Sequence, residues 1–229
     1  MKIGKIISVS ELGVEILTDG AEVRYRDMLY TELNGKHYRF EVQAVEGSIV
    51  NAISFESCAG LKRGLEVYKE ERGLAMEYSD AILGKVFNPY GDTIDGTEVE
   101  EPHVRSVYSE PLSMSQIDIN GDILWTGIKV LDFFAPMQKG FKMGLLGGAG
   151  VGKTVLIKSN SVFIGVGERS REGKELYDEM LEADLLDKMG MVFGQMGENS
   201  VSRAHAVQAG LTQAEYLRDE KHQDVLLFI

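Results

Sequence analysis

The residues with the clearest chemical meaning form a glycine-rich run in the second half of the chain. It reads Gly147-Gly148-Ala149-Gly150-Val151-Gly152-Lys153-Thr154 and fits the pattern Gly-x4-Gly-Lys-Thr. Glycines let backbone N–H groups close around phosphate oxygens without Cβ clashes, the lysine reaches the terminal phosphates, and the threonine hydroxyl binds Mg²⁺. The run therefore predicts a P-loop that binds ATP or ADP together with Mg²⁺.

The elements that must hold this loop are unusually close together in the sequence. Only Val155–Asn160 separates Thr154 from the next strand-like run, Ser161–Val166. A parallel crossover usually needs about a dozen residues or more. A helix from Thr154 to Asn160 would advance only about 10 Å, at ~1.5 Å per residue, whereas a typical strand is ~17–20 Å long. Either the helix melts or the strand shifts its register, and both outcomes weaken phosphate binding.

The rest of the C-terminal half alternates between strand and helix patterns, which is typical of an α/β domain. The predicted strands are Lys142–Leu146, Ser161–Val166, Met189–Gly194 and Asp224–Ile229. A helix is expected over Arg171–Lys188, where leucines and a methionine recur at helical spacing. Two further helices are expected, one with Ser202 as N-cap running through Val207, and one over Leu211–Arg218.

The N-terminal part shows short β-rich runs separated by turn signals. The predicted strands are Lys5–Val9, Gly13–Leu17, Val23–Tyr25, Tyr38–Val45, Ile49–Phe55 and Leu65–Lys69. Frequent short strands favour a small barrel. We therefore expect an N-terminal β-barrel over residues 1–75 and a partial α/β P-loop (RecA-like) nucleotide-binding domain over residues 76–229.

Composition narrows the class of partner and compartment. The chain of 229 residues carries a net charge of −12, which argues against nucleic acid as a partner. Cys58 is the single cysteine, so we expect a small buried side chain in a reducing compartment rather than a disulfide. The N-terminus lacks the apolar core of a signal peptide, and no run approaches the ~18 apolar residues of a membrane-spanning helix.

Several motifs together resemble the catalytic β subunit of F-type ATP synthases. They are Leu124–Asp132, Ala135-Pro136, the Gly147–Thr154 loop, Gly165–Gly173, Gly194-Gln195-Met196, Gly210–Asp219 and Gln223–Ile229. Gly60–Val67 and Leu83–Asn88 resemble the end of that family's barrel and the start of its nucleotide domain. The resemblance runs nearly end to end and is looser before residue 60.

The resemblance implies roles for particular residues. Glu168 stands where the catalytic subunit has Glu and the non-catalytic α subunit has Gln, so it would orient or deprotonate the water that attacks the γ-phosphate. Lys153 and Arg169 would hold phosphates, Thr154 would bind Mg²⁺, and Glu172 would hold a water on that ion. A carboxylate at the carboxyl end of a parallel strand does face the ligand crevice of an α/β sheet. Without the family, Glu168-Arg169 is equally well read as a surface ion pair.

The sequence also departs from the family. Besides the short segment after Thr154, the chain ends at Ile229, before the family's Asp that organises the Mg²⁺ shell, its adenine-packing aromatic residues and its C-terminal helical domain. The family's Asn-Glu-Pro-Pro-Gly pattern reads Gly197-Glu198-Asn199-Ser200-Val201, without prolines. His205 stands where the family tends to have Arg, and we expect it to be solvated or packed.

The resemblance implies α-type subunits in a hetero-hexameric ring and a central rotor subunit as partners. It also implies ATP synthesis or hydrolysis coupled to proton transport, and a cytoplasmic location peripheral to the inner face of the plasma membrane when assembled. The alternatives are a non-catalytic or degenerate relative that acts only through subunit contacts, and another hexameric ATPase such as the flagellar export ATPase or the terminator Rho. The isolated chain is expected to be inactive or very slow, and no direct membrane insertion is expected.

Overall fold

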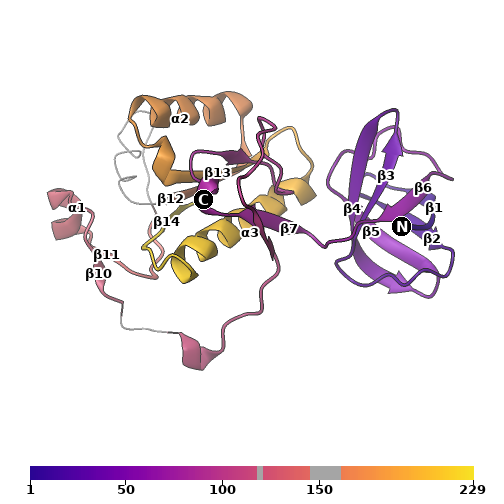
Figure 1. Cartoon of the computed structure of the whole chain (residues 1–229), viewed down its shortest axis with the longest axis horizontal. Coiled ribbons are helices and arrows are strands. Elements are labelled where there is room, and N and C mark those ends of the chain that lie inside the picture. Colours follow the sequence, from indigo (N-terminus) through magenta and orange to yellow (C-terminus); the bar gives the residue numbers. More distant parts are fainter. Residues whose placement is uncertain (118–120, 145–160) are drawn as a thin grey trace.

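The computed structural model describes residues 1–117, 121–144 and 161–229. An N-terminal barrel lies at one end of the molecule, and a parallel sheet with one long helix on each face lies at the other (Figure 1). The predicted phosphate-binding loop, Gly147–Thr154, falls outside the described residues.

The barrel is closed by six antiparallel strands in the order β1-β2-β5-β4-β3-β6. Their bounds are β1 Lys2–Val9, β2 Gly13–Thr18, β3 Met28–Leu33, β4 Lys36–Glu46, β5 Ile49–Ser54 and β6 Glu66–Lys69. Alternate residues of each strand point inward, and Ile16, Leu29, Phe40, Val50 and Val67 are fully buried there. The predicted small barrel is confirmed.

One barrel strand was misplaced by sequence reasoning. The predicted strand Val23–Tyr25 is a turn, in which the Asp27 carboxylate accepts a hydrogen bond from the Arg24 backbone N–H at 2.7 Å and Arg26 has a φ of 67°. The strand follows this turn instead, as β3. A side chain that caps the turn outweighs the β propensity of Val23 and Tyr25.

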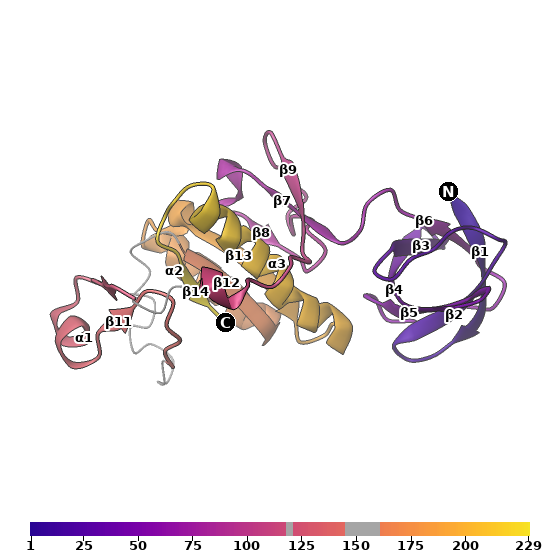
Figure 2. The ribbon, with the colours of Figure 1, turned by 90° about the horizontal axis from the view of Figure 1, so that it is seen from below.

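Short elements lead from the barrel into the C-terminal part. They are β7 Ala75–Tyr78, a 3-10 helix at Asp80–Ile82, β8 Val86–Phe87, β9 His103–Ser106 and a 3-10 helix at Met114–Gln116. β10 Ile123–Leu124 and β11 Met137–Gln138 pair around α1 Lys129–Phe134, and this unit stands at the edge of the molecule (Figure 2). It leaves Phe133 and Phe134 79% and 78% exposed.

The C-terminal sheet is parallel, in the order β14-β12-β13-β8. Its further strands are β12 Ser161–Glu168, β13 Met189–Gln195 and β14 Leu226–Phe228. Val162, Ile164 and Val192 pack with Ala206 and Ala209 of α3 on one face. Phe163, Met191 and Phe193 pack with Met180 of α2 on the other face. The three strands predicted over this stretch are confirmed, together with the α/β arrangement.

The predicted strand Lys142–Leu146 is wrong where it can be compared. Residues 142–144 have no regular secondary structure, and residues 145 and 146 lie outside the described residues. The physical reason is that both edges of β12 are already hydrogen-bonded, to β13 on one side and to β14 on the other. Over Ser161–Phe163, the described strands therefore leave no open edge of β12 for a strand that leads into the predicted loop.

The helix predicted over Arg171–Lys188 ends earlier. It is α2, Ser170–Glu182, and a 3-10 helix follows at Leu186–Lys188. Asp184 adopts a left-handed φ of 55°, and the N–H groups of Asp184 and Leu185 donate to the carbonyls of Leu181 and Met180. This is the hydrogen-bond pattern of a Schellman motif, which satisfies the last carbonyls and stops the helix.

The two helices predicted after Gly197 are one helix, α3, Ser200–Asp219. Its N-cap is Asn199, whose side chain accepts from the Ser202 N–H at 2.9 Å, rather than Ser202 itself. Gly210 does not break the helix: a Cβ at this position would lie 2.4 Å from Cγ1 of Ile164, so the glycine lets α3 approach the sheet closely.

The expectation of a small buried side chain at Cys58 is confirmed. Cys58 is buried and unpaired, and burial raises the pKa of its thiol. Among the described residues, no helix is long and apolar enough to cross a membrane.

Gln213 yields a test of the α3–sheet packing. Its side chain is fully buried, and neither polar atom of its amide has a hydrogen-bond partner in the described part of the chain. An unsatisfied buried polar group costs about 1–3 kcal/mol. We therefore expect Gln213→Met, which keeps the volume and removes the polar atoms, to raise the free energy of unfolding by roughly that amount in urea denaturation. The same exchange at exposed Gln138 should change it by less than about 0.5 kcal/mol. A destabilised Gln213→Met protein would show that the amide is satisfied after all.

Candidate functional site

The described part of the candidate site lies where β12 ends and α2 begins. Glu168 is the last residue of β12, Arg169 is the N-cap of α2, and Glu172 lies in the first turn of that helix. The structure thus brings these three predicted residues together at the carboxyl end of a parallel strand. The other predicted site residues, including Lys153 and Thr154, belong to the loop outside the described residues.

Two glycines shape this turn. Gly167 has a φ of 77°, which residues with a side chain rarely adopt, and it lets the chain turn from the strand toward α2. A Cβ on Gly165 would lie 2.5 Å from the Phe193 ring and 2.8 Å from Cγ of Glu168. The Glu168 side chain therefore folds back over the strand beside Phe193, on the face of the sheet that α2 covers.

Contacts across the strand ends fix the position of Glu168. The backbone N–H of Met196 donates to the Glu168 carbonyl at 2.8 Å, and the Ser170 hydroxyl donates to Oε1 of Gln195 at 2.8 Å. Sequence reasoning assigned no role to Ser170 or Gln195. Their positions in the sequence could have indicated this contact, because each lies where a predicted strand ends. Gln195 ends the neighbouring parallel strand, and the carboxyl ends of parallel strands meet at one edge of a sheet.

Burial and a second carboxylate raise the pKa of Glu168. Its pKa is raised above 4.5, first by burial and then by the charge of Glu172 and a hydrogen bond between the two carboxyl groups. An elevated pKa is the property expected of a carboxylate that acts as a general base, because proton affinity rises with it. The pair also offers the hard oxygen ligands that Mg²⁺ prefers.

Arg169 supplies positive charge beside this pair. Its Nη1 lies 3.7 Å from Oε1 of Glu172, with the two side chains 68% and 53% exposed. An ion pair as exposed as this contributes about 0–1 kcal/mol. Arg169 is therefore free to exchange its carboxylate for an anionic ligand at little cost.

A second guanidinium reaches the same edge from the opposite face of the sheet. Nη1 of Arg203, in the first turns of α3, lies 3.6 Å from the position that a Cβ on Gly167 would take. Its Nε is buried and has no hydrogen-bond partner among the described residues. Sequence reasoning gave Arg203 no role, because its closeness to Gly167 depends on how α3 crosses the sheet.

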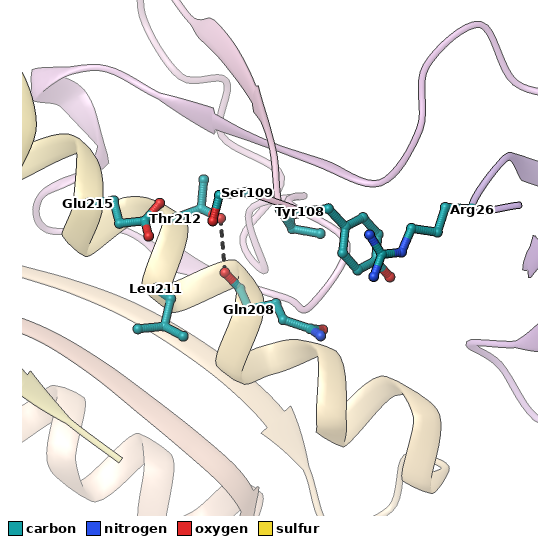
Figure 3. Close-up of a pocket in the computed structure, with 8 residues that line it drawn as sticks. Arg26, Tyr108, Ser109, Gln208, Leu211, Thr212 and Glu215 are labelled. Carbon is teal, nitrogen blue, oxygen red and sulfur yellow. Dashed lines mark hydrogen bonds between the residues drawn. The ribbon is translucent and has the colours of Figure 1, made fainter. Parts of the chain in front are cut away.

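A small cavity lies away from this edge, between the barrel and α3. It has a volume of about 230 Å³, and Arg26, Tyr108, Ser109, Gln208, Leu211, Thr212 and Glu215 line it (Figure 3). Arg26 lies over the Tyr108 ring, with its guanidinium carbon 3.7 Å from the ring centroid. Glu168, Arg169 and Glu172, the predicted site residues that the structure describes, do not line this cavity.

Residues 127–229 match the ATP synthase alpha/beta family, nucleotide-binding domain. The matched range includes every described element from α1 to β14, and therefore the whole edge that carries Glu168 and Arg169. This part of the chain is similar to a nucleotide-binding domain of an F- or V-type ATPase. The family as a whole binds nucleotides and assembles into oligomeric rotary ATPases.

Gly165 tests the geometry of the turn. In Gly165→Ala the new methyl group would collide with the Phe193 ring and displace the Glu168 side chain, so we expect a loss of about 1–3 kcal/mol in the free energy of unfolding. Chemical denaturation measures this loss. Gly197→Ala is the matched control, because no atom lies within 4 Å of its Cβ position. Equal stability of the two variants would contradict the described packing.

Glu168 gives a pH-dependent test. Because its pKa is raised in the folded state, its charge destabilises the fold above that pKa and has no such effect below about 4.5, where the carboxyl is neutral in both states. Glu168→Gln should therefore raise the unfolding temperature at neutral pH, and the gain should shrink as the pH falls toward 4.5. Glu179→Gln, on the exposed side of α2, should show no such trend. A gain that grows on acidification would refute the assignment.

Proposed function

We propose that this chain is a β-type subunit of the ATP synthase family, which binds ATP or ADP with Mg²⁺ at the carboxyl edge of its parallel sheet. The observation that carries the proposal is Glu168, a carboxylate at the end of β12 with a raised pKa, followed directly by Arg169 at the start of α2. Glutamate at this position is what the resemblance assigns to catalytic subunits. The proposed domains are a barrel over residues 1–75 and a P-loop (RecA-like) domain over residues 76–229.

The proposed roles follow from charge and position. Lys153 and Arg169 bind the phosphates, and Glu168 orients the attacking water and takes its proton. Thr154 binds Mg²⁺ directly, and Glu172 holds one of its waters. When bound, Mg²⁺ neutralises charge that develops on the phosphates.

The residues at this edge fit such an ion. Mg²⁺ keeps several waters and usually takes only one or two protein carboxylates in addition to phosphate oxygens. Burial and the charge of Glu172 raise the pKa of Glu168, so a cation placed near the two carboxyl groups relieves repulsion. Among the described residues there is no group of three or more His, Cys, Asp or Glu side chains arranged to hold a metal ion.

The proposed function also includes partner subunits. α-type neighbours in a hetero-hexameric ring and a central rotor subunit are the proposed partners, with ATP turnover coupled to proton transport. The exposed rings of Phe133 and Phe134 on α1 support a protein contact, because surface of this kind is common at subunit interfaces. In a hetero-hexameric ring of this family, the neighbouring α-type subunit adds an arginine to the site. ATP turnover by the chain alone should therefore be very slow.

A second candidate is a non-catalytic relative that acts only through subunit contacts. The observation that favours it is the direct pairing of β12 with β14, together with the lack of a strand at residues 142–144. A phosphate-binding loop is normally aimed by the strand before it, and a weakly positioned loop binds phosphate weakly.

Calorimetric titration with Mg-ADP and Mg-ATP separates the two candidates. The β-type proposal expects a Kd of about 1 µM to 1 mM, weakened at least about tenfold (~1.4 kcal/mol) in Lys153→Ala because the phosphate-binding cation is lost. Lys142→Ala, at an exposed residue outside the loop, is the matched control. A folded wild-type chain that binds neither nucleotide would favour the non-catalytic candidate. Turnover by the isolated chain above about 1 s⁻¹, abolished in Lys153→Ala, would contradict the predicted slowness.

A further inference from the structure

A buried polar cluster joins the barrel to α3. Glu41 on β4 is 2% exposed and His205 on α3 is 7% exposed, and Tyr108 lies between them from the segment after β9. The Tyr108 hydroxyl donates a short hydrogen bond to Oε1 of Glu41 and lies 3.1 Å from Nε2 of His205. The cluster therefore links three chain segments that are far apart in the sequence.

The expectation that His205 is solvated or packed is confirmed in its second form, and its orientation is fixed by a backbone contact. Nδ1 of the imidazole lies 2.8 Å from the Val201 carbonyl oxygen, which can only accept, so Nδ1 carries a proton. In the neutral imidazole Nε2 then has no proton and is an acceptor. It faces the Tyr108 oxygen at 3.1 Å and Oε2 of Glu41 at 3.5 Å.

This arrangement leaves a neutral His205 short of a donor. Tyr108 has one hydroxyl proton, which it gives to Glu41, and the Gln43 amide donates to Oε2 of Glu41 at 2.8 Å. The Nε2 lone pair of a neutral imidazole thus faces two acceptor oxygens. Protonation of Nε2 turns this repulsion into a charge-assisted hydrogen bond and an ion pair within a buried site.

The surroundings of His205 add no competing charge. Glu41 and Gln43 approach His205 from β4, and Tyr108 approaches it from the segment after β9. The ring of Phe55, at the end of the barrel, packs edge-on against the imidazole with 4.8 Å between the ring centroids. The Arg26 guanidinium stacks on the Tyr108 ring (Figure 3). Among the described residues, Glu41 is the one charged group that acts on the imidazole.

We propose that Glu41, Tyr108 and His205 form a proton-dependent latch, which holds the barrel against α3 when the imidazole is protonated and weakens when it is neutral. Other junction contacts do not involve a histidine: Nη2 of Arg39 donates to Oδ2 of Asp92 at 2.9 Å, the Asn199 amide donates to the Ser54 and Glu56 carbonyls at 2.7 and 3.2 Å, and Phe55 packs edge-on against Tyr90 at 5.3 Å. Interfaces between parts of one chain permit relative motion unless they are large and hydrophobic. A change of charge inside the junction between the barrel and α3 therefore shifts the balance between closed and open forms.

The pH range in which the latch holds follows from the shifted pKa values of His205 and Glu41. Burial acts to lower the pKa of His205, but the hydrogen bonds to Glu41 and to the Val201 carbonyl hold it above 6.5. Its contribution to closure is complete below 6.5 and is lost as the pH rises through the raised pKa. Burial likewise acts to raise the pKa of Glu41, but His205 and Tyr108 hold it below 4.5, so its contribution is lost only as the pH falls below that range. The latch is strongest between these limits.

The test uses the full chain labelled at two exposed positions, Glu15→Cys on the barrel and Glu179→Cys on α2, since the native Cys58 is buried. Energy transfer between the two dyes reports the distance between the parts at about pH 5.5 and about pH 8.5, on either side of an ordinary histidine pKa. The ratio of open to closed molecules should rise between these pH values. The rise should be about tenfold for each pKa unit by which closure favours the imidazolium.

Variants assign this change to the cluster. His205→Arg carries a permanent charge and should stay closed at both pH values, whereas Glu41→Gln should be open at both. His205→Gln, which cannot become charged, should show the high-pH distribution at both pH values, and it replaces the arginine variant should that one fail to fold. His222→Asn, at an exposed residue with a φ of 52°, should behave as wild type.

An NMR titration of the His205 ring completes the test. The expected midpoint lies above 6.5 in the wild type and falls in Glu41→Gln. Unchanged distances in the wild type while His205 changes its charge would overturn the latch. So would a wild-type response in His205→Gln, or a midpoint at or below 6.5.

Discussion

The close approach of α3 to the parallel sheet is the constraint on which the other features depend. A Cβ on Gly210 would lie 2.4 Å from the Ile164 side chain, and one on Gly194 would lie 3.0 Å from Cα of Arg203. Because both glycines lack a side chain, α3 lies directly on β12 and β13 and buries Ala206 and Ala209 against them. A protein interior tolerates little overlap, so these positions fix the height and rotation of the helix over the sheet.

That placement decides what stands at the carboxyl edge. α3 sets Arg203 beside Gly167 on one face, while Phe193 and α2 hold Glu168 and Glu172 on the other. The edge therefore combines two carboxylates, of which Glu168 has a raised pKa, with two guanidinium groups, of which Arg169 makes only an exposed ion pair. Charge of both signs at the end of parallel strands is suited to a phosphate ligand that carries its own cation.

The same helix also joins the barrel to the sheet. Asn199 caps α3 with its side-chain oxygen and binds two barrel carbonyls with its amide nitrogen, and two turns later His205 meets Glu41. A buried ion pair of this kind gains little net stability over an apolar contact, since removing both charges from water offsets the attraction. Its consequence is specificity and sensitivity to protons rather than strength.

The sequence by itself determined the features that repeat locally. Alternating apolar residues defined most barrel strands and the strands that became β12, β13 and β14, and the residue order placed Glu168 and Arg169 at the end of a strand. Only the tertiary structure decided that Gly210 lies inside one helix, that Asn199 rather than Ser202 is the cap, that β14 pairs with β12, and that His205 faces Glu41. The physical reason is that periodicity and turn chemistry act between neighbours in the chain, whereas burial, steric fit and proton affinity are set by groups that folding brings together from distant segments.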